Sequence, residues 1–163
     1  MQLVLIRHAR AEERALFKRD RTRALTADGR RRMCKAARGL HELVPGMTRI
    51  ATSPLRRARQ TAEIVAKVCN SSETMPLAAL APGGTVRAVL AWLRAQPADA
   101  TLALVGHEPD LGLLAGWLLS GKQTGFVQFK KGAAALIAFA GAPAAGKGTL
   151  AWLLTAAQLS EIG

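Results

Sequence analysis

The sequence contains few of the residues from which several kinds of site are built. Its two cysteines, Cys34 and Cys69, lie 35 positions apart and belong to no C-x-x-C pair, so neither a zinc site nor a disulfide framework is indicated. There is no tyrosine, and there are only four phenylalanines and three tryptophans, too few for the stacking platform of a protein that binds single-stranded nucleic acid. We therefore expect reduced thiols that pack as small apolar side chains.

Long apolar segments are also missing. The longest stretch without a charged residue, 132–146, is interrupted by glycines and by Pro143, and it is too short to span a bilayer. The opening letters MQLVLIRH reach a charge at Arg7, too early for the apolar region of a signal peptide. The sequence thus predicts a cytoplasmic protein without membrane association.

Acidic residues are scarce, because 11 Asp and Glu stand against 23 Lys and Arg, which gives a formal charge of +12 at pH 7. The excess is uneven, since 16 of the 23 basic residues lie within positions 1–60. Such an imbalance favours anionic partners, namely phosphorylated small molecules, acidic proteins or nucleic acid. A solvated basic surface is the alternative for most of these arginines. The carboxylates form no cluster in the sequence, so no metal site is expected.

What the sequence does contain is a regular alternation of apolar runs and amphipathic segments. Its 163 residues are about the length of one domain, and we predict a single domain over 1–163. Runs rich in Val, Ile and Leu predict strands, and apolar residues spaced three to four apart predict helices. The predicted strands cover 3–6, 49–53, 101–106, 133–140 and 149–155, and the predicted helices cover 28–44, 53–69, 86–95 and 109–119.

The order of these segments predicts the fold class, which is α/β. Strands that alternate with helices of this length need crossover connections, so we expect three layers, α/β/α, with a mainly parallel central sheet. The last two strands are separated by a short segment and are expected to form an antiparallel hairpin at one edge. Thr26 is placed to cap the first helix, and Ser53 and Pro54 are placed to begin the second.

Unusual polar residues follow three of the predicted strands. Arg7 and His8 end the first, Ser53 and then Arg56 or Arg57 follow the second, and His107 and Glu108 follow the third. In an open α/β sheet a ligand binds outside the carboxyl ends of the strands, so these side chains are expected to converge. A neutral imidazole can accept a phosphoryl group, and guanidinium groups can stabilise the charge on its oxygens. The pattern therefore favours phosphoryl chemistry.

A second phosphate motif occurs near the end of the chain, where residues 141–149 read GAPAAGKGT. The pattern resembles the phosphate loop G-x-x-x-x-G-K-[ST], but Gly148 occupies the position of the hydroxyl residue. Only 14 residues follow Thr149, and no apolar strand ends in an Asp that could complete a magnesium site. We interpret the segment as a turn between two edge strands, with Lys147 solvated. A P-loop enzyme and a non-catalytic nucleic-acid binder are the remote alternatives.

Five motifs together resemble the histidine phosphatase superfamily, the relatives of cofactor-dependent phosphoglycerate mutase, and within it the small SixA-type phosphohistidine phosphatases. They occur in the order found in that family and cover nearly the whole chain. The motifs are LIRHARAE at 5–12, LTADGRRR at 25–32, SPLRRARQTAEI at 53–64, LALVGHEPDL at 102–111, and FKKGAAALIAF at 129–139 with GTLAWLLT at 148–155.

This resemblance implies a role for each candidate residue. His8 would be the nucleophile that becomes phosphorylated, and Arg7 and Arg57 would bind the phosphoryl oxygens. His107 would be the second histidine, which bonds to the phosphoryl group, and Arg23 would be an additional phosphate or substrate contact. No cofactor is implied.

Two departures from the wider family refine this expectation. Ala9 replaces the glycine of the R-H-G motif, which the SixA-type branch tolerates, and the chain has no room for the inserted cap that carries a general acid in the mutases. Glu108 is the one obvious stand-in, and we expect it to cap a helix instead. The resemblance thus implies a phosphoglycerate mutase-like fold without a cap domain, an open crevice, and a phosphohistidine-bearing protein as the substrate, in signal transduction. A phosphorylated metabolite or nucleotide is the alternative substrate, and no oligomeric state is indicated.

Overall fold

A single six-stranded sheet forms the centre of the molecule, and its strand order is β3-β2-β4-β1-β5-β6. The computed structural model describes residues 1–16, 20–70 and 73–163. The first four strands in this order are parallel, whereas β5 is antiparallel to β1 and β6 is antiparallel to β5. The mainly parallel sheet with an antiparallel edge hairpin is therefore confirmed. The strands are β1 (Gln2–Arg7), β2 (Arg49–Thr52), β3 (Glu73–Pro76), β4 (Thr101–Gly106), β5 (Ala134–Ala138) and β6 (Thr149–Leu154).

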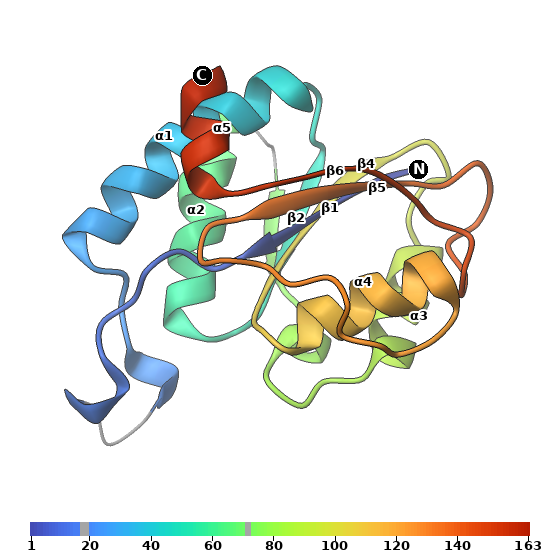
Figure 1. Ribbon diagram of the computed structural model, residues 1–163, viewed down its shortest axis with the longest axis horizontal. Coiled ribbons are helices and arrows are strands. Elements are labelled where there is room, and N and C mark those ends of the chain that lie inside the picture. The colour runs from blue at the N-terminus through green and yellow to red at the C-terminus, as the bar shows by residue number, and fades with distance from the viewer. Residues whose placement is uncertain (17–19, 71–72) are drawn as a thin grey trace.

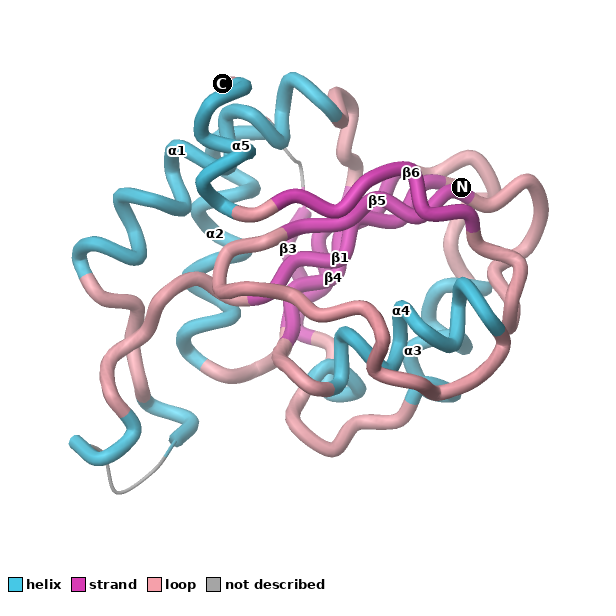
Figure 2. The backbone as a smooth tube through the Cα atoms, viewed as in Figure 1, coloured by secondary structure: helices cyan, strands magenta, loops and turns pink. Residues whose placement is uncertain are grey.

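Helices cover both faces of this sheet, as Figures 1 and 2 show. Helices α1, α2 and α5 pack on one face, and α3 and α4 pack on the other. The three-layer arrangement expected from the sequence is thus confirmed. The α-helices are α1 (Ala27–Leu43), α2 (Arg56–Cys69), α3 (Val86–Arg94), α4 (Asp110–Ser120) and α5 (Ala156–Ile162), and the short 3-10 helices are η1 (Arg14–Leu16), η2 (Asp20–Thr22) and η3 (Ala78–Leu80).

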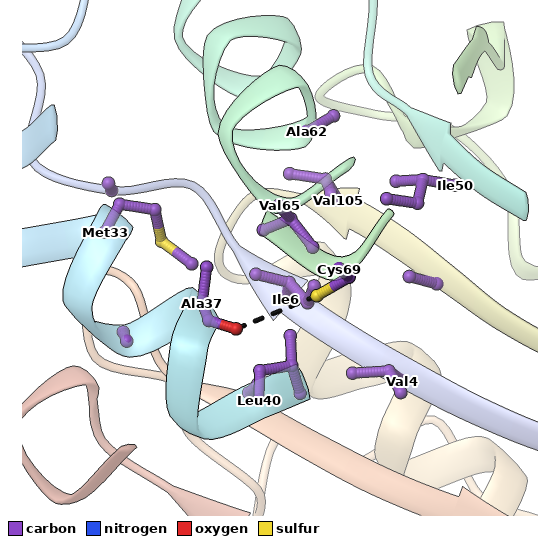
Figure 3. Close-up of a cluster of buried hydrophobic side chains, with 14 of the residues drawn as sticks. Val4, Ile6, Met33, Ala37, Leu40, Ile50, Ala62, Val65, Cys69 and Val105 are labelled. Carbon is purple, nitrogen blue, oxygen red and sulfur yellow. Dashed lines mark hydrogen bonds between the residues drawn. The ribbon is translucent and has the colours of Figure 1, made fainter. Parts of the chain in front are cut away.

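Two apolar cores lie on the two sides of the central strand β1. Because successive side chains of a strand point to opposite faces, Val4 and Ile6 enter one core while Leu3 and Leu5 enter the other. Figure 3 shows the core beneath α1 and α2, where Cys69 Sγ lies 3.7 Å from the backbone oxygen of Ala37. Burial raises the pKa of the Cys69 thiol to about 11, so this cysteine packs as a protonated apolar side chain, as expected.

The helix termini agree with the sequence in one case and differ in another. Thr26 caps α1, since its hydroxyl accepts a hydrogen bond from the N–H of Gly29 at 2.9 Å. The expectation that Ser53 caps the second helix is wrong, because α2 begins at Arg56 and Leu55 occupies the capping position. The Ser53 hydroxyl is engaged elsewhere, at 2.7 Å from His107 Nε2. Ser53 thus bonds to a residue distant in sequence instead of capping α2.

Among the strands and α-helices, β3 and α5 were not expected from the sequence. Strand β3 has four residues and ends in Pro76 at the edge of the sheet, so it lacks the long apolar run that marks a buried strand. Helix α5 has seven residues and is held by a close approach to α1. A Cβ built on Gly39 of α1 would lie 1.9 Å from the backbone oxygen of Leu159.

The glycine loop at 141–149 connects β5 to β6, and its amides hold the end of a helix. Gly146 N–H donates to Trp117 O at 3.1 Å, and Gly148 N–H donates to Leu118 O at 3.0 Å, both near the carboxyl end of α4. Lys147 is exposed, and a strand rather than a helix follows the loop. The P-loop alternative is therefore wrong, and the interpretation as a turn is confirmed. None of the helices in the described part of the chain is long and apolar enough to cross a membrane.

Candidate active site

The two histidines singled out in the sequence lie side by side at the carboxyl edge of the sheet. His8 follows β1, and His107 follows the neighbouring strand β4. Their ring centroids are 5.0 Å apart with an interplanar angle of 57°. The next strand, β2, ends beside Ser53, which contacts His107. Three adjacent parallel strands thus deliver these side chains to one place, as the sequence predicted.

The hydrogen bonds of His8 determine which ring nitrogen carries the proton. Its Nδ1 lies 2.8 Å from the backbone oxygen of Ala9. Because a carbonyl can only accept, Nδ1 holds the proton and donates it. The Nε2 lone pair is then available, and it accepts a hydrogen bond of 3.2 Å from Nε of Arg57. The ring is therefore a neutral imidazole with its nucleophilic nitrogen turned toward a guanidinium group.

The surroundings of His8 keep the ring neutral. Burial is the largest cause, and the neighbouring His107, Arg57 and Arg7 act in the same direction, so the pKa of His8 falls to about 3 although the bond to Ala9 opposes the shift. The side chain is 6% exposed. At neutral pH the imidazole is almost entirely in the form that can attack an electrophile.

Arg57 lies in the first turn of α2 and is 4% exposed. All three of its nitrogens donate hydrogen bonds, Nε to His8 and the two terminal nitrogens to the backbone and side chain of Asp20 at 3.0 and 2.9 Å. Arg56, by contrast, is exposed and donates to Thr22 O at 3.4 Å. Of these two neighbouring arginines, Arg57 is therefore the one that enters the site, as expected.

Arg7 approaches the site from the end of β1 and is held by the loop that precedes β5. One of its terminal nitrogens donates to Phe129 O at 2.6 Å. The N–H of the same residue, Phe129, donates to the carboxylate of Glu108 at 2.6 Å. The expectation that Glu108 caps α4 is therefore wrong, since its carboxylate is used to fix the Phe129 backbone. Glu108 thereby positions the group that holds Arg7.

His107 is buried between the strand ends, and its pKa is lowered to about 4, chiefly by desolvation and then by the charge of Arg57. Its Nε2 bonds to the Ser53 hydroxyl, which also accepts from Leu55 N–H at 3.4 Å. Among the described residues, His107 Nδ1 and Arg7 Nε are buried atoms without a hydrogen-bond partner. Buried polar groups are nearly always satisfied, so two such atoms at one site indicate room for a polar ligand.

Asp20, at the start of η2, is a site residue that the sequence analysis missed. Its carboxylate bridges Arg57 and Arg23, and Arg23 approaches it with two nitrogens at 2.8 Å. Burial alone raises the pKa of Asp20, but the hydrogen bonds and charges of the two arginines outweigh this effect and lower it. The surplus of arginines at this edge was a signal that a counter-charge was needed. The sequence did not show which carboxylate supplies it.

The assembled side chains form a cationic site around the neutral imidazole of His8. Arg7, Arg57 and His107 adjoin His8, and Arg23 joins them through Asp20. Across the described ranges, no three side chains of His, Cys, Asp or Glu come together as metal ligands. This arrangement suits transfer of an anionic group to imidazole more than reactions that need several carboxylates.

Known proteins resemble this chain in sequence and in structure. Residues 3–81 match the family model described as the histidine phosphatase superfamily (branch 1). An uncharacterised protein of Picosynechococcus sp. is 41% identical over 144 residues, which cover 82% of this chain and 87% of that protein. The protein histidine phosphatase SixA, solved in complex with tungstate, matches with a TM-score of 0.85 at 29% identity, over 98% of this chain and 99% of that one. A SixA structure from Nakamurella multipartitia matches with a TM-score of 0.76, also at 29% identity, over 94% of each chain. The resemblance to SixA drawn from the motifs is thus confirmed for the fold.

Proposed function

The chain belongs to the histidine phosphatase superfamily, and we propose that this phosphatase works through a covalent phosphohistidine on His8. One observation carries the proposal. The proton of His8 is held on Nδ1 by Ala9, so Nε2 offers its lone pair beside the guanidinium group of Arg57. A neutral imidazole next to fixed cations is what acceptance of a phosphoryl group requires.

In the first step, Nε2 of His8 attacks the phosphorus atom, a P–N bond forms, and the bond to the leaving group breaks. Arg57 turns its donor from Nε2 to the phosphoryl oxygens, and Arg7 supplies the buried Nε that lacks a partner. His107 Nδ1 is likewise free to bond to a phosphoryl oxygen. In the second step, water attacks the phosphorus of phospho-His8, the P–N bond breaks, and phosphate leaves. One proton of the water passes to the solvent.

A phosphohistidine in a partner protein is the substrate that this site fits best. When such a ring is protonated on its second nitrogen, it departs as neutral imidazole and needs no general acid. The carboxylate nearest to the histidines in sequence, Glu108, is committed to Phe129 N–H, and Asp20 is committed to two arginines. Neither carboxylate is therefore free to protonate a leaving group, so substrates that need such a proton should react slowly. The names of both SixA relatives refer to histidine phosphatases, which agrees with this choice.

In this mechanism, residues 1–163 act as one catalytic domain that needs no metal ion. A phosphorylated metabolite or nucleotide, hydrolysed by the same two steps, is the second candidate substrate. The observation in its favour is that the contacts at His8 address only the phosphoryl group.

The test is a panel of phosphorylated substrates assayed with EDTA present. It includes a phosphohistidine protein, a sugar phosphate, a nucleotide and phosphoramidate. We expect turnover without metal, fastest on the phosphohistidine protein, and loss of at least about a thousandfold in His8→Ala, as for other covalent nucleophiles.

The matched control is His41→Ala, because His41 lies on α1 away from the site. Activity in this variant should equal that of the wild type. Equal activity of His8→Ala and wild type would contradict the mechanism, and preference for a metabolite over the protein would contradict the substrate.

A further inference from the structure

A groove runs alongside the active site at the carboxyl edge of β1. It has a volume of about 310 Å³, and its walls come from the segment after β1, the start of α1, the segment before β5 and the start of α5. In Figure 1 these are the dark-blue chain that leaves β1, the first turn of α1, the orange chain that enters β5 and the red start of α5. We call it the basic groove, after the charged residues on its walls, which are Arg10, Arg32, Lys130 and Lys131.

The basic groove begins one residue from the proposed nucleophile. The backbone oxygen of Ala9, which lines the groove, accepts a hydrogen bond from Nδ1 of His8. Gly132, on the opposite wall, donates its N–H to the backbone oxygens of Arg7 and His8 at 3.2 and 3.3 Å. Both walls of the groove are thus hydrogen-bonded to the residue proposed as the nucleophile.

Small residues leave the hollow open. A Cβ on Gly29 would lie 2.1 Å from the backbone oxygen of Arg10, and Gly132 has a φ of +76°, a conformation that other residues rarely adopt. Ala9 and Ala156 line the same space. Close backbone approaches therefore form the groove, which has room for an extended segment of another chain.

The charge of the groove is strongly positive. Four of its lining residues are cationic, and Asp28 is the one carboxylate among them. Asp28 is shared, since it lies 3.9 Å from Arg10 and 2.9 Å from Arg32 and also pairs with Arg31. Within the described chain, no carboxylate lies within ion-pair distance of Lys130 or Lys131.

The cations of the groove are exposed, as are Arg30, Lys35 and Arg38 at other positions of α1. What distinguishes the groove is that its cations come from three segments distant in sequence and converge on one hollow. Like charges brought together in this way repel one another unless an anion joins them.

We propose that the basic groove binds an acidic segment of the partner protein, rich in Asp and Glu and adjacent to its phosphohistidine. This inference rests on the proposed function, because it assigns the partner of the same site. Opposite charges steer the partner to the groove and orient its phosphohistidine toward His8. Binding must then weaken as salt is added, since exposed charges are screened.

The experiment uses two synthetic phosphohistidine peptides that differ only in the residues beside the phosphohistidine, which are Glu in one and Gln in the other. We expect kcat/KM to be about tenfold higher for the Glu peptide at low salt, and the preference to fade as salt is raised. The double variant Arg32→Gln, Lys131→Gln should lose most of that preference while hydrolysing phosphoramidate at the wild-type rate.

The matched control is Lys35→Gln, Arg38→Gln, which removes the same charge from exposed positions on α1 outside the groove and should keep the preference. Equal hydrolysis of the two peptides by the wild type would overturn the inference, as would an equal loss in both double variants. Binding of both peptides is also measured with His8→Ala, which does not turn them over. Tighter binding of the Glu peptide without hydrolysis by the wild type would support the groove and contradict the proposed function.

Discussion

At the scale of single residues, the site depends on histidines that stay neutral. Both rings lose solvent on folding, and the nearby arginines disfavour a further positive charge, so the pKa is about 3 for His8 and about 4 for His107. An unfolded histidine titrates near 6.5. Neutrality therefore keeps the lone pair of the proposed nucleophile, His8, available, and it makes protonation of either ring costly to the native state.

The first prediction concerns stability against pH. Between pH 6.5 and about 4 the unfolded chain binds protons on His8 and His107 that the native chain does not bind, so the free energy of unfolding rises with pH in this window. From pH 7 to pH 5 we expect a loss of roughly 2 kcal/mol for each of the two rings. Urea unfolding at both pH values measures it, and His8→Asn should reduce the loss by about half. A free energy that is the same at pH 5 and pH 7 in the wild type would show that the rings are not held neutral.

The second prediction concerns Asp20, whose carboxylate occupies Arg57 and Arg23 in this structure. An incoming phosphate competes with that carboxylate for the same donors. Asp20→Asn removes the competing charge, so inorganic phosphate should inhibit the variant at a concentration lower by about three- to tenfold. Inhibition constants for phosphate check this.

Asp99→Asn is the control for Asp20. Asp99 is exposed and lies just before β4, at the amino ends of the parallel strands, whereas the site lies at their carboxyl ends. It should leave inhibition by phosphate unchanged. Weaker inhibition of Asp20→Asn than of the wild type would mean that Asp20 supports anion binding by orienting Arg57.

At the scale of elements, the carboxyl ends of β1, β2 and β4 fix the site, and these ends could be predicted from the sequence. Val, Ile and Leu runs identified the strands; Arg7 ends β1, and His8 and His107 directly follow β1 and β4. Ser53 was misassigned because a capping residue is recognised from local sequence, whereas its hydroxyl bonds to His107, 54 positions away. Asp20 escaped prediction for a similar reason, since its role depends on how the chain after β1 folds back over Arg57.

The third prediction concerns the packing of α5 on α1. Gly39 allows the backbone of α5 to approach α1, and an added Cβ would meet Leu159 O at 1.9 Å. Gly39→Ala should therefore destabilise the fold by about 1–3 kcal/mol, as overpacking does, although alanine favours helix. Urea unfolding checks the value.

The control for Gly39 is Gly141→Ala in the glycine loop, where an added Cβ meets no atom within 4 Å. It should change the stability by less than about 0.5 kcal/mol. If Gly39→Ala proves as stable as Gly141→Ala, α5 is not held closely against α1.

At the scale of the whole molecule, the topology explains why one half of the chain dominates the site. The strand order places β1 between β4 and β5, so the basic segment after β1 lies between the loops that follow β4 and precede β5. Of the 23 basic residues, 16 lie within positions 1–60, and Arg7, Arg23 and Arg57 among them lie at the candidate site. The excess charge could be read from the sequence, but the basic groove could not, because the groove exists only when four segments of the chain meet.

The central claim is that the phosphoryl group passes through Nε2 of His8. The direct measurement is to mix the enzyme with a phosphohistidine protein, quench in alkali within one turnover, and identify the phosphorylated atom by mass spectrometry and phosphorus NMR. We predict one alkali-stable, acid-labile phosphate on Nε2 of His8, the nitrogen that accepts from Arg57, and none in His8→Ala. Hydrolysis without a phosphoenzyme in the wild type, or phosphate on any other atom, would contradict the account.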